Sequence, residues 1–195
     1  MNSGTVKIIS GTLRGKKIPF LNSKYGDADI TPQKVKGALF SMLGERLYGK
    51  VFVDLFSGSG QIGFEAISRG AQEVIFNEAD RSRFSFIKEF ASSLHADIKP
   101  LFLNMKAADA LRYVSGKGIK ADIIFIDPPY EKIKGEAESY GSIINVIEEC
   151  GIMAAGGVVI IQHFSKNVLH ESYGSFSLVS CKKYGTTTLS VYSSD

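Results

Sequence analysis

The stretch at residues 51–63 constrains the fold more than any other part of the chain, because it joins a strand, a tight turn and a helix. Residues 51–53 are a short run of Val and Phe, which is typical of a strand covered on both faces. The run ends at Asp54, and Gly58 and Gly60 follow within six residues. Glycines let the backbone turn tightly and let a ligand approach it closely. The stretch therefore predicts a nucleotide-type pocket at the end of a strand.

Glu78 belongs to the same expected pocket. It ends an apolar run at residues 74–78, about 20 residues after the glycine turn, where doubly wound folds place the acid that holds a nucleotide ribose. An ordinary strand-to-helix turn with a solvated Glu78 would show the same pattern, because the spacing of Gly58, Gly60 and Gly63 alone is a weak signal. On these residues alone both interpretations stay open.

Asp54 bears on the identity of the ligand. A pyrophosphate needs bare N–H groups at a helix N-terminus, and a carboxylate at the strand end would repel it. The same carboxylate suits a ligand that is positively charged at this point. S-adenosylmethionine carries a sulfonium and an α-ammonium group and has no phosphate. Asp54 therefore favours S-adenosylmethionine over a dinucleotide.

The composition indicates a globular protein with a basic N-terminal part. The 195 residues are 44% hydrophobic and 22% charged, and no apolar run approaches the roughly 18 residues of a membrane span. With no signal-type segment at the start, we expect a cytoplasmic protein. Residues 1–50 carry a formal charge of +6 and the remainder −3, so the N-terminal part is expected to meet a polyanion. The cysteines and histidines show no metal-ligand spacing, so no metal is expected.

Residues 1–30 are expected to form a β-hairpin arm and a loop, and residues 31–195 the main domain. Short apolar segments at residues 6–9 and 17–20 flank a basic tip with two glycines, which is typical of a hairpin. Thr31 is a good N-cap and Pro32 is tolerated at the first helical position. A helix should therefore begin there and end near Gly49.

From residue 51 the pattern alternates between strands and helices, which predicts a parallel sheet with helices on both faces. The expected strands lie at residues 51–54, 73–78, 98–103, 121–126 and 157–162. The expected helices lie near residues 60–69, 81–95, 107–115 and 136–150. Two last strands, at about residues 175–184 and 187–193, should form a hairpin at one edge of the sheet. The polar stretch at residues 132–139 is expected to be a loop beside the site.

The sequence Asp127-Pro128-Pro129-Tyr130 follows the expected strand at residues 121–126. In open α/β sheets ligands bind outside the carboxyl ends of the strands, so this motif should lie on the same rim as the glycine turn. Two prolines remove two N–H donors and leave the Asp127 carboxylate and the Pro128 carbonyl as acceptors. Such acceptors can hold the N–H bonds of an exocyclic amino group on a nucleobase. They can also stabilise the charge that develops as a methyl group arrives.

Asp127 could then accept the released proton, directly or through water, and Tyr130 could stack on the base, as a flipped base requires. A rigid strand-end turn would explain the Pro-Pro pair by itself. An acid-Pro-Pro-aromatic sequence at a strand end, downstream of a nucleotide-type turn, is much more specific for methylation of an amino group.

These segments together resemble the bacterial ribosomal RNA guanine-N2 methyltransferase family of the RsmD type, which modifies the 16S RNA of the small subunit. The resemblance runs from Val6 to about Tyr192. It rests on residues 8–16, on residues 31–40, on the turn at residues 54–63 and on the Asp-Pro-Pro-Tyr motif. Many amino-methyltransferases share the last motif, so the N-terminal segments are what distinguish this family from the others.

The resemblance implies a Rossmann-like α/β fold with a seven-stranded, mostly parallel sheet, S-adenosylmethionine as the cofactor and no metal. It implies 16S ribosomal RNA or an assembling small subunit as the partner, and we expect a monomer. The expected cofactor-binding residues are Asp54, Phe56, Ser57, Gly58, Ser59, Gly60, Glu78, Ala79, Lys106 and Ala107. The expected catalytic residues are Asp127, Pro128, Pro129 and Tyr130. The basic residues expected to face RNA are Arg14, Lys16, Lys17, Lys34 and Lys36.

The chain departs from the family pattern in three places. Before Thr31 the family usually carries Arg-Pro, and here residues 29–30 are Asp-Ile. The two helix arginines of the family are Lys34 and Lys36 here, which keep the charge but lose the bidentate fork. Near the adenine edge many relatives have an acid before Ala, and here Lys106 stands in that position.

Three other functions share parts of the pattern. An amino-methyltransferase acting on adenine or cytosine, in DNA or another RNA, would carry the same Asp-Pro-Pro-Tyr motif. A nicotinamide-dependent oxidoreductase would use the glycine turn, but Asp54 argues against it. A non-catalytic RNA-binding protein built on a methyltransferase would not need Asp127, and the intact motif argues against that function.

Overall fold

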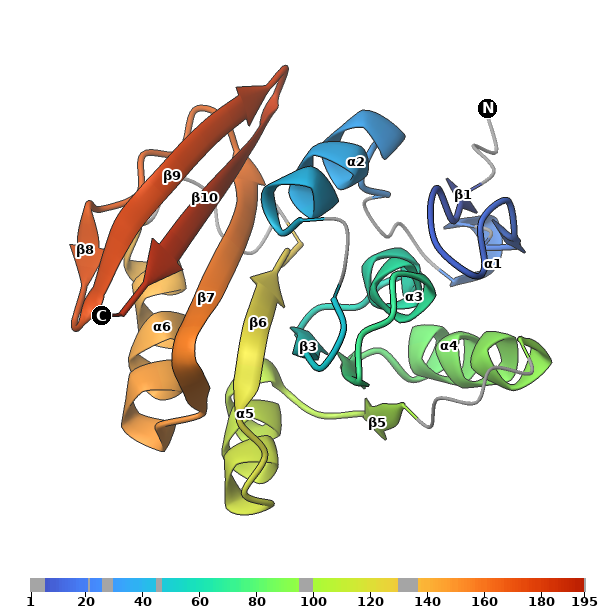
Figure 1. The fold of residues 1–195 in the computed structure, drawn as a ribbon, viewed down its shortest axis with the longest axis horizontal. Coiled ribbons are helices and arrows are strands. Elements are labelled where there is room, and N and C mark those ends of the chain that lie inside the picture. Colours follow the sequence, from blue (N-terminus) through green and yellow to red (C-terminus); the bar gives the residue numbers. More distant parts are fainter. Residues whose placement is uncertain are drawn as a thin grey trace.

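The computed structural model describes residues 6–20, 22–25, 30–44, 47–94, 100–129 and 137–194. Its centre is an eight-stranded sheet in which the first five strands are parallel and the last three are antiparallel (Figure 1). The sheet order is β5 (Leu101–Leu103), β4 (Glu73–Asn77), β3 (Val51–Asp54), β6 (Ala121–Ile126), β7 (Met153–Phe164), β10 (Thr187–Ser193), β9 (Phe176–Tyr184) and β8 (Ser172–Tyr173). The expected α/β fold with a mostly parallel sheet is confirmed.

Helices cover both faces of the sheet, as the alternation predicts. One face packs against α2 (Gln33–Met42), α3 (Gln61–Ser68) and α4 (Arg81–Ser93), and the other against α5 (Ala107–Gly116) and α6 (Ala137–Cys150) (Figure 1). Successive residues of β3 point to opposite faces. Phe52 joins the first core and Val53 the second. This two-sided burial explains why the central strands are continuous apolar runs.

The N-terminal arm is an antiparallel hairpin of β1 (Val6–Lys7) and β2 (Lys17–Ile18), in which Val6 pairs with Ile18. Val6, Ile8 and Ile18 are buried and belong to the same core cluster as the apolar side chains of α2 and α3. At its tip the Cα of Gly11, with φ of 82°, lies directly against the Ser68 carbonyl at the end of α3. The arm therefore packs tightly on α3.

Several details differ from the expectation. The sheet has eight strands rather than seven, because the two-residue β8 adds to β9 beyond the predicted hairpin. The segment expected to be a loop at residues 21–30 contains the short helix α1 (Asn22–Tyr25), whose Tyr25 packs against Phe20 and Phe86.

The helix expected to reach Gly49 ends earlier. α2 stops at Met42, because Gly44 adopts a φ of 83°, outside the helical region. Its N-cap is Pro32 rather than Thr31. The predicted loop at residues 132–139 lies outside the described residues up to residue 136, and α6 begins at Ala137. In the described ranges, no helix has the length and apolar character that crossing a membrane requires.

Candidate functional site

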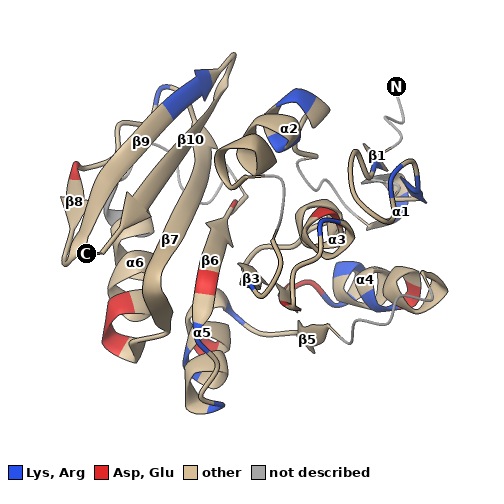
Figure 2. Ribbon diagram, viewed as in Figure 1, with Lys and Arg blue, Asp and Glu red and all other residues tan. Residues whose placement is uncertain are grey.

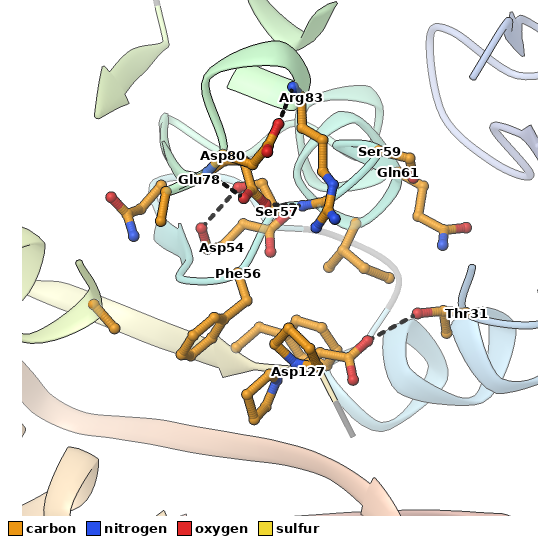
Figure 3. A pocket seen from close by; sticks show the side chains of 18 of the residues that line it. Thr31, Asp54, Phe56, Ser57, Ser59, Gln61, Glu78, Asp80, Arg83 and Asp127 are labelled. Atoms are coloured by element: carbon orange, nitrogen blue, oxygen red, sulfur yellow. Dashed lines mark hydrogen bonds between the residues drawn. The ribbon is translucent and has the colours of Figure 1, made fainter. Parts of the chain in front are cut away.

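A cavity of about 670 Å³ opens at the carboxyl ends of β3, β4 and β6 (Figure 3). Parallel strands place their carboxyl ends on one rim, where α/β folds bind ligands. The lining comprises Thr31, Asp54, Phe56, Ser57, Gly58, Ser59, Gln61, Ile62, Asn77, Glu78, Ala79, Asp80, Arg83, Met105, Ala107, Phe125, Asp127, Pro128 and Pro129. The two predicted halves of the site, the glycine turn and the Asp-Pro-Pro segment, therefore face one cavity.

Asp54 is the last residue of β3 and is almost completely buried. Its Oδ2 accepts a hydrogen bond from the Gly63 N–H at 3.0 Å, while the buried Oδ1 has no hydrogen-bond partner in the described part of the chain. Burial raises the pKa of Asp54 to about 7; the Gly63 N–H opposes this rise and the charge of Glu78 adds to it. A buried acceptor without a donor is costly, so Asp54 is suited to a cationic N–H group.

Gly60 shapes the turn from behind the cavity. It has a φ of 74° and lies at the N-cap of α3, and its N–H donates to the Ser57 carbonyl at 2.6 Å. A Cβ at this position would come within 2.6 Å of the Phe64 ring. Gly60 is absent from the lining, so its contribution is the shape of the turn, whereas Ser57, Gly58 and Ser59 line the cavity.

Glu78 follows β4 and is fixed by backbone donors. Its Oε2 accepts from the Gly58 N–H and its Oε1 from the Asp80 N–H, both at 2.8 Å. The Asn104 amide in turn donates to the carbonyls of Glu78 and Ala79. Each carboxylate oxygen keeps further acceptor capacity. Glu78 is thus rigidly presented at the rim, as a residue that holds two hydroxyl groups would need to be.

The part of the cavity that is expected to hold the adenine, at residues 105–107, agrees with the expectation only in part. Ala107 and Met105 line the cavity, but Lys106 between them is exposed and lies outside the lining. Lys106 is the N-cap of α5 and makes no side-chain capping bond. The expectation that Lys106 lines the cofactor pocket is therefore not met in this structure.

Asp127 ends the β6 segment and lies in the same cavity as Asp54 (Figure 3). Its Oδ2 accepts hydrogen bonds from Gln162 Nε2 at 2.7 Å and Thr31 Oγ1 at 3.3 Å. Pro128 and Pro129 also line the cavity. Tyr130, expected to stack on a base, lies outside the described residues.

The arm and α2 carry several basic residues, and others lie on α4, α5 and β9 (Figure 2). Arg14, Lys16, Lys17 and Lys34 are exposed, as a polyanion contact requires. Lys36 is different and corrects the expectation, because its side chain is 0% exposed. Its ammonium donates to the Lys7 carbonyl at 2.6 Å and lies 3.5 Å from Glu65 Oε2. Lys36 therefore cannot face RNA.

Glu65 of α3 is the partner that sequence reasoning missed. Its side chain is 0% exposed. Its carboxylate accepts hydrogen bonds from the Ile9 N–H at 2.8 Å, the Ser10 N–H at 3.0 Å and Arg69 Nε at 2.9 Å. Burial lowers the pKa of Lys36, and the charge of Glu65 opposes that change. A signal for burial existed in the sequence, since Lys36 stands three and four residues before the apolar Leu39 and Phe40.

Other cavity residues were also missed. Arg83 of α4 lines the cavity and its Nε donates to the Tyr25 carbonyl at 3.1 Å. It is the only Lys or Arg among the described lining residues. Gln162, which contacts Asp127 but lies outside the lining, was missed as well; it follows a run of Val and Ile in β7, and that change to a polar residue was the available signal. No group of three His, Cys, Asp or Glu side chains suited to a metal occurs in the ranges that the structure describes.

The sequence matches the family described as conserved hypothetical protein 95 over residues 6–193. The chain belongs to this family. Among its relatives, Ribosomal RNA small subunit methyltransferase D of Escherichia coli strain K12 is 29% identical over 191 residues, which is 97% of this chain and 90% of that protein. The match confirms the resemblance to the RsmD type.

Solved structures agree with this assignment. Escherichia coli yhhF, described as a candidate methyltransferase, has a TM-score of 0.74 at 26% identity, and the match covers 97% of both chains. An RNA methyltransferase from Salinibacter ruber, solved with S-adenosyl-L-homocysteine, has a TM-score of 0.62 at 15% identity and covers 84% of this chain and 92% of that one. The second likeness concerns the fold alone. The architecture is that of the Rossmann-like, S-adenosylmethionine-dependent methyltransferases.

Proposed function

We propose that the protein transfers a methyl group from S-adenosylmethionine to the N2 amino group of a guanine in 16S ribosomal RNA. The observation that carries the proposal is that Asp54 and Asp127, from two different strand ends, line one cavity. A cationic donor beside Asp54 and an amino group beside Asp127 would then share one space. The relative in Escherichia coli, named for the small ribosomal subunit, supports the choice of RNA.

The residues of the cavity fit S-adenosylmethionine by charge. The α-ammonium group would meet the unpartnered Oδ1 of Asp54, and the ribose hydroxyls would meet Glu78. The α-carboxylate needs a positive partner, and Arg83 supplies it from α4. Because its Nε is fixed on the Tyr25 carbonyl, the other N–H groups of its guanidinium remain available to the cavity. Bound there, S-adenosylmethionine supplies an electrophilic methyl group.

The Asp-Pro-Pro segment would hold the acceptor. The Asp127 carboxylate and the Pro128 carbonyl accept hydrogen bonds from the two N–H donors of the guanine amino group. These bonds orient the nitrogen lone pair towards the methyl group. As the new N–C bond forms, the nitrogen gains positive charge, which the same two acceptors stabilise. The proton then leaves to Asp127 or through it to water. The methylated base and the demethylated cofactor are the two products.

The exposed basic residues Arg14, Lys16, Lys17 and Lys34 would bind RNA phosphates. The arm and α2 pack on the same face of the sheet as α3, and Thr31 links the start of α2 to the cavity. We propose that residues 1–30 act as an RNA-contacting arm on the catalytic domain of residues 31–195. Such a protein would act as a monomer in the cytoplasm, where ribosomal subunits assemble.

The test is methyl transfer from radiolabelled S-adenosylmethionine to four substrates: naked 16S RNA, small ribosomal subunits, transfer RNA and duplex DNA. We expect label in 16S RNA or the subunit, and N2-methylguanosine in a nucleoside digest analysed by mass spectrometry. Label in adenine or cytosine, or label in DNA alone, would refute the proposed acceptor. The Asp127→Ala protein, with unchanged cofactor affinity, serves as the negative control.

A further inference from the structure

Asp127 is held by two side chains that lie far from it in the sequence. Gln162 Nε2, on β7, donates to Asp127 Oδ2 at 2.7 Å. Thr31 Oγ1, just before α2, donates to the same oxygen at 3.3 Å (Figure 3). Gln162 Nε2 also lies 3.3 Å from Thr31 Oγ1. These three contacts connect the side chains of Asp127, Gln162 and Thr31 pairwise, and Asp127 Oδ2 accepts two of them.

Both donors are buried. Gln162 is 2% exposed and follows the fully buried Ile160 and Ile161, and Thr31 is 3% exposed. A buried amide or hydroxyl destabilises the folded protein when it lacks a hydrogen bond. The carboxylate of Asp127 accepts from the Gln162 amide nitrogen and the Thr31 hydroxyl, so both buried donors have a partner, whereas Gln162 Oε1 has none among the described residues.

The Thr31 hydroxyl does not cap α2. A threonine before a helix normally caps it, but the N-cap of α2 is Pro32 and makes no side-chain capping bond. The backbone of Thr31 is fixed instead by Gln61. With its amide oriented to satisfy both groups, Gln61 accepts from the Thr31 N–H at 2.7 Å and donates to the Thr31 carbonyl at 3.2 Å.

Gln61 is the first residue of α3, directly after the glycine turn. Hydrogen bonds therefore connect Gln61, at the end of the glycine turn, to Thr31, and Thr31 to Asp127. Gln162 of β7 binds Asp127 from another strand. A carboxylate on the end of a strand can rotate about two side-chain bonds. Two donors on one oxygen remove that freedom and fix the direction of the remaining lone pairs.

We propose that Thr31 and Gln162 are positioning residues, which hold the Asp127 carboxylate in the orientation that grips the amino group of the acceptor base. The inference rests on the proposed methyl transfer, because it assigns these residues a part in that reaction. The proposal assigns neither residue a contact with the reacting atoms, although Thr31 lines the cavity. Their effect on the rate passes through Asp127 alone.

Matched substitutions test the proposal. Thr31→Val keeps the shape and removes the hydroxyl, Thr31→Ser keeps the hydroxyl, and Gln162→Met keeps the length and removes the donor. We expect Thr31→Val and Gln162→Met each to lower kcat about 10- to 100-fold, because small misplacements of a reacting group have effects of this size. Thr31→Ser should retain at least about half of the activity.

The affinity for S-adenosylmethionine, measured by calorimetry, and the KM for RNA should stay within about twofold in all three variants. The double variant should lose less than the product of the two single losses, because both substitutions act on one carboxylate. A kcat within about twofold of the unaltered protein in Thr31→Val and Gln162→Met would overturn the proposal. A parallel loss of cofactor affinity would overturn it too, since that would indicate general disruption.

A crystal structure of Thr31→Val separates this inference from the proposed function. If the unaltered protein methylates no nucleic acid, the proposed function fails, but the orientation of Asp127 can still be observed. We expect its carboxylate to rotate away from the position seen beside Gln162. An unchanged carboxylate in both single variants would refute the positioning role, whatever the substrate.

Discussion

Replacing Asp54 by asparagine should stabilise the ligand-free protein at neutral pH while abolishing the binding of a cationic cofactor. Asp54 is fully buried at the end of β3, and burial raises its pKa to about 7 from the usual 3.8. Between these two values the folded protein keeps a proton that the unfolded chain has lost. Stability therefore falls as the pH rises through this window, and the full penalty is present above pH 7.

The size of the penalty follows from the shift. A difference of about three pKa units corresponds to roughly 4 kcal/mol at pH 8, and to about 2 kcal/mol at pH 5, where only the unfolded chain is ionised. Asparagine keeps the acceptor for the Gly63 N–H and cannot ionise. Asp54→Asn should therefore be about 4 kcal/mol more stable than the unaltered protein at pH 8, with the gain shrinking towards pH 4.

Urea denaturation at pH 5, 6, 7 and 8 measures this difference, with far-UV circular dichroism as the signal because the chain has no tryptophan. Asp80→Asn is the matched control. Asp80 lies on the same rim but is exposed, its hydrogen bonds lower its pKa, and asparagine also caps helices well. Equal pH slopes for Asp54→Asn and the unaltered protein would refute the reasoning, since Asp54 would then ionise as an ordinary carboxyl does.

The remaining predictions concern ligand binding, catalysis and the arm. Affinity for S-adenosylmethionine should rise with pH between 6 and 8 in isothermal titrations, because the ionised form of Asp54 binds the cation; a flat profile would contradict this. Arg83→Met should weaken cofactor binding by about tenfold, as expected for one charged hydrogen bond, whereas Arg81→Met on the exposed side of α4 should not. Asp127→Ala should remove methyl transfer at unchanged cofactor affinity, and a collapse of binding would show that its role is misassigned. Glu65→Leu should lower the free energy of unfolding by roughly 3–5 kcal/mol, because it leaves Lys36 buried without its carboxylate; the double substitution with Lys36→Met should recover part of the loss in urea titrations. Alanine at three exposed arm residues should reduce the salt slope of RNA binding by about 2, and alanine at Arg112 on α5 and at Lys117, its C-cap, should leave it unchanged. The three arm residues are Arg14, Lys16 and Lys17.

The fold and the rim of the site could be predicted because both follow from short-range pattern. Alternating apolar strands and helices dictate a parallel sheet, and the carboxyl ends of its strands must share one edge. Asp54, Glu78 and Asp127 each stand at the end of such a strand, so their meeting in one cavity was predictable from their positions alone.

The side-chain pairs were not predictable, because they join residues that no periodicity relates. Lys36 and Glu65 are 29 residues apart, and a lysine in a helix is ordinarily assigned to the surface. The contact between Gln162 and Asp127 spans 35 residues, and that between Thr31 and Asp127 spans 96. The helix α1 was missed because its four residues form through the contacts of Tyr25 with Phe20 and Phe86 rather than through local propensity.

The buried carboxylate of Glu65 has a consequence for how this protein can change over time. Glu65, on the helix that follows the glycine turn, holds both the arm at Ile9 and Ser10, next to its tip, and the buried Lys36 of α2. The exposed side chains Arg14, Lys16 and Lys17 can therefore vary to suit a different RNA contour. The backbone of the arm, which is bound to Glu65 and Ser68, cannot be exchanged without disturbing α3. Substrate range in such a chain should evolve through single exposed side chains of the arm.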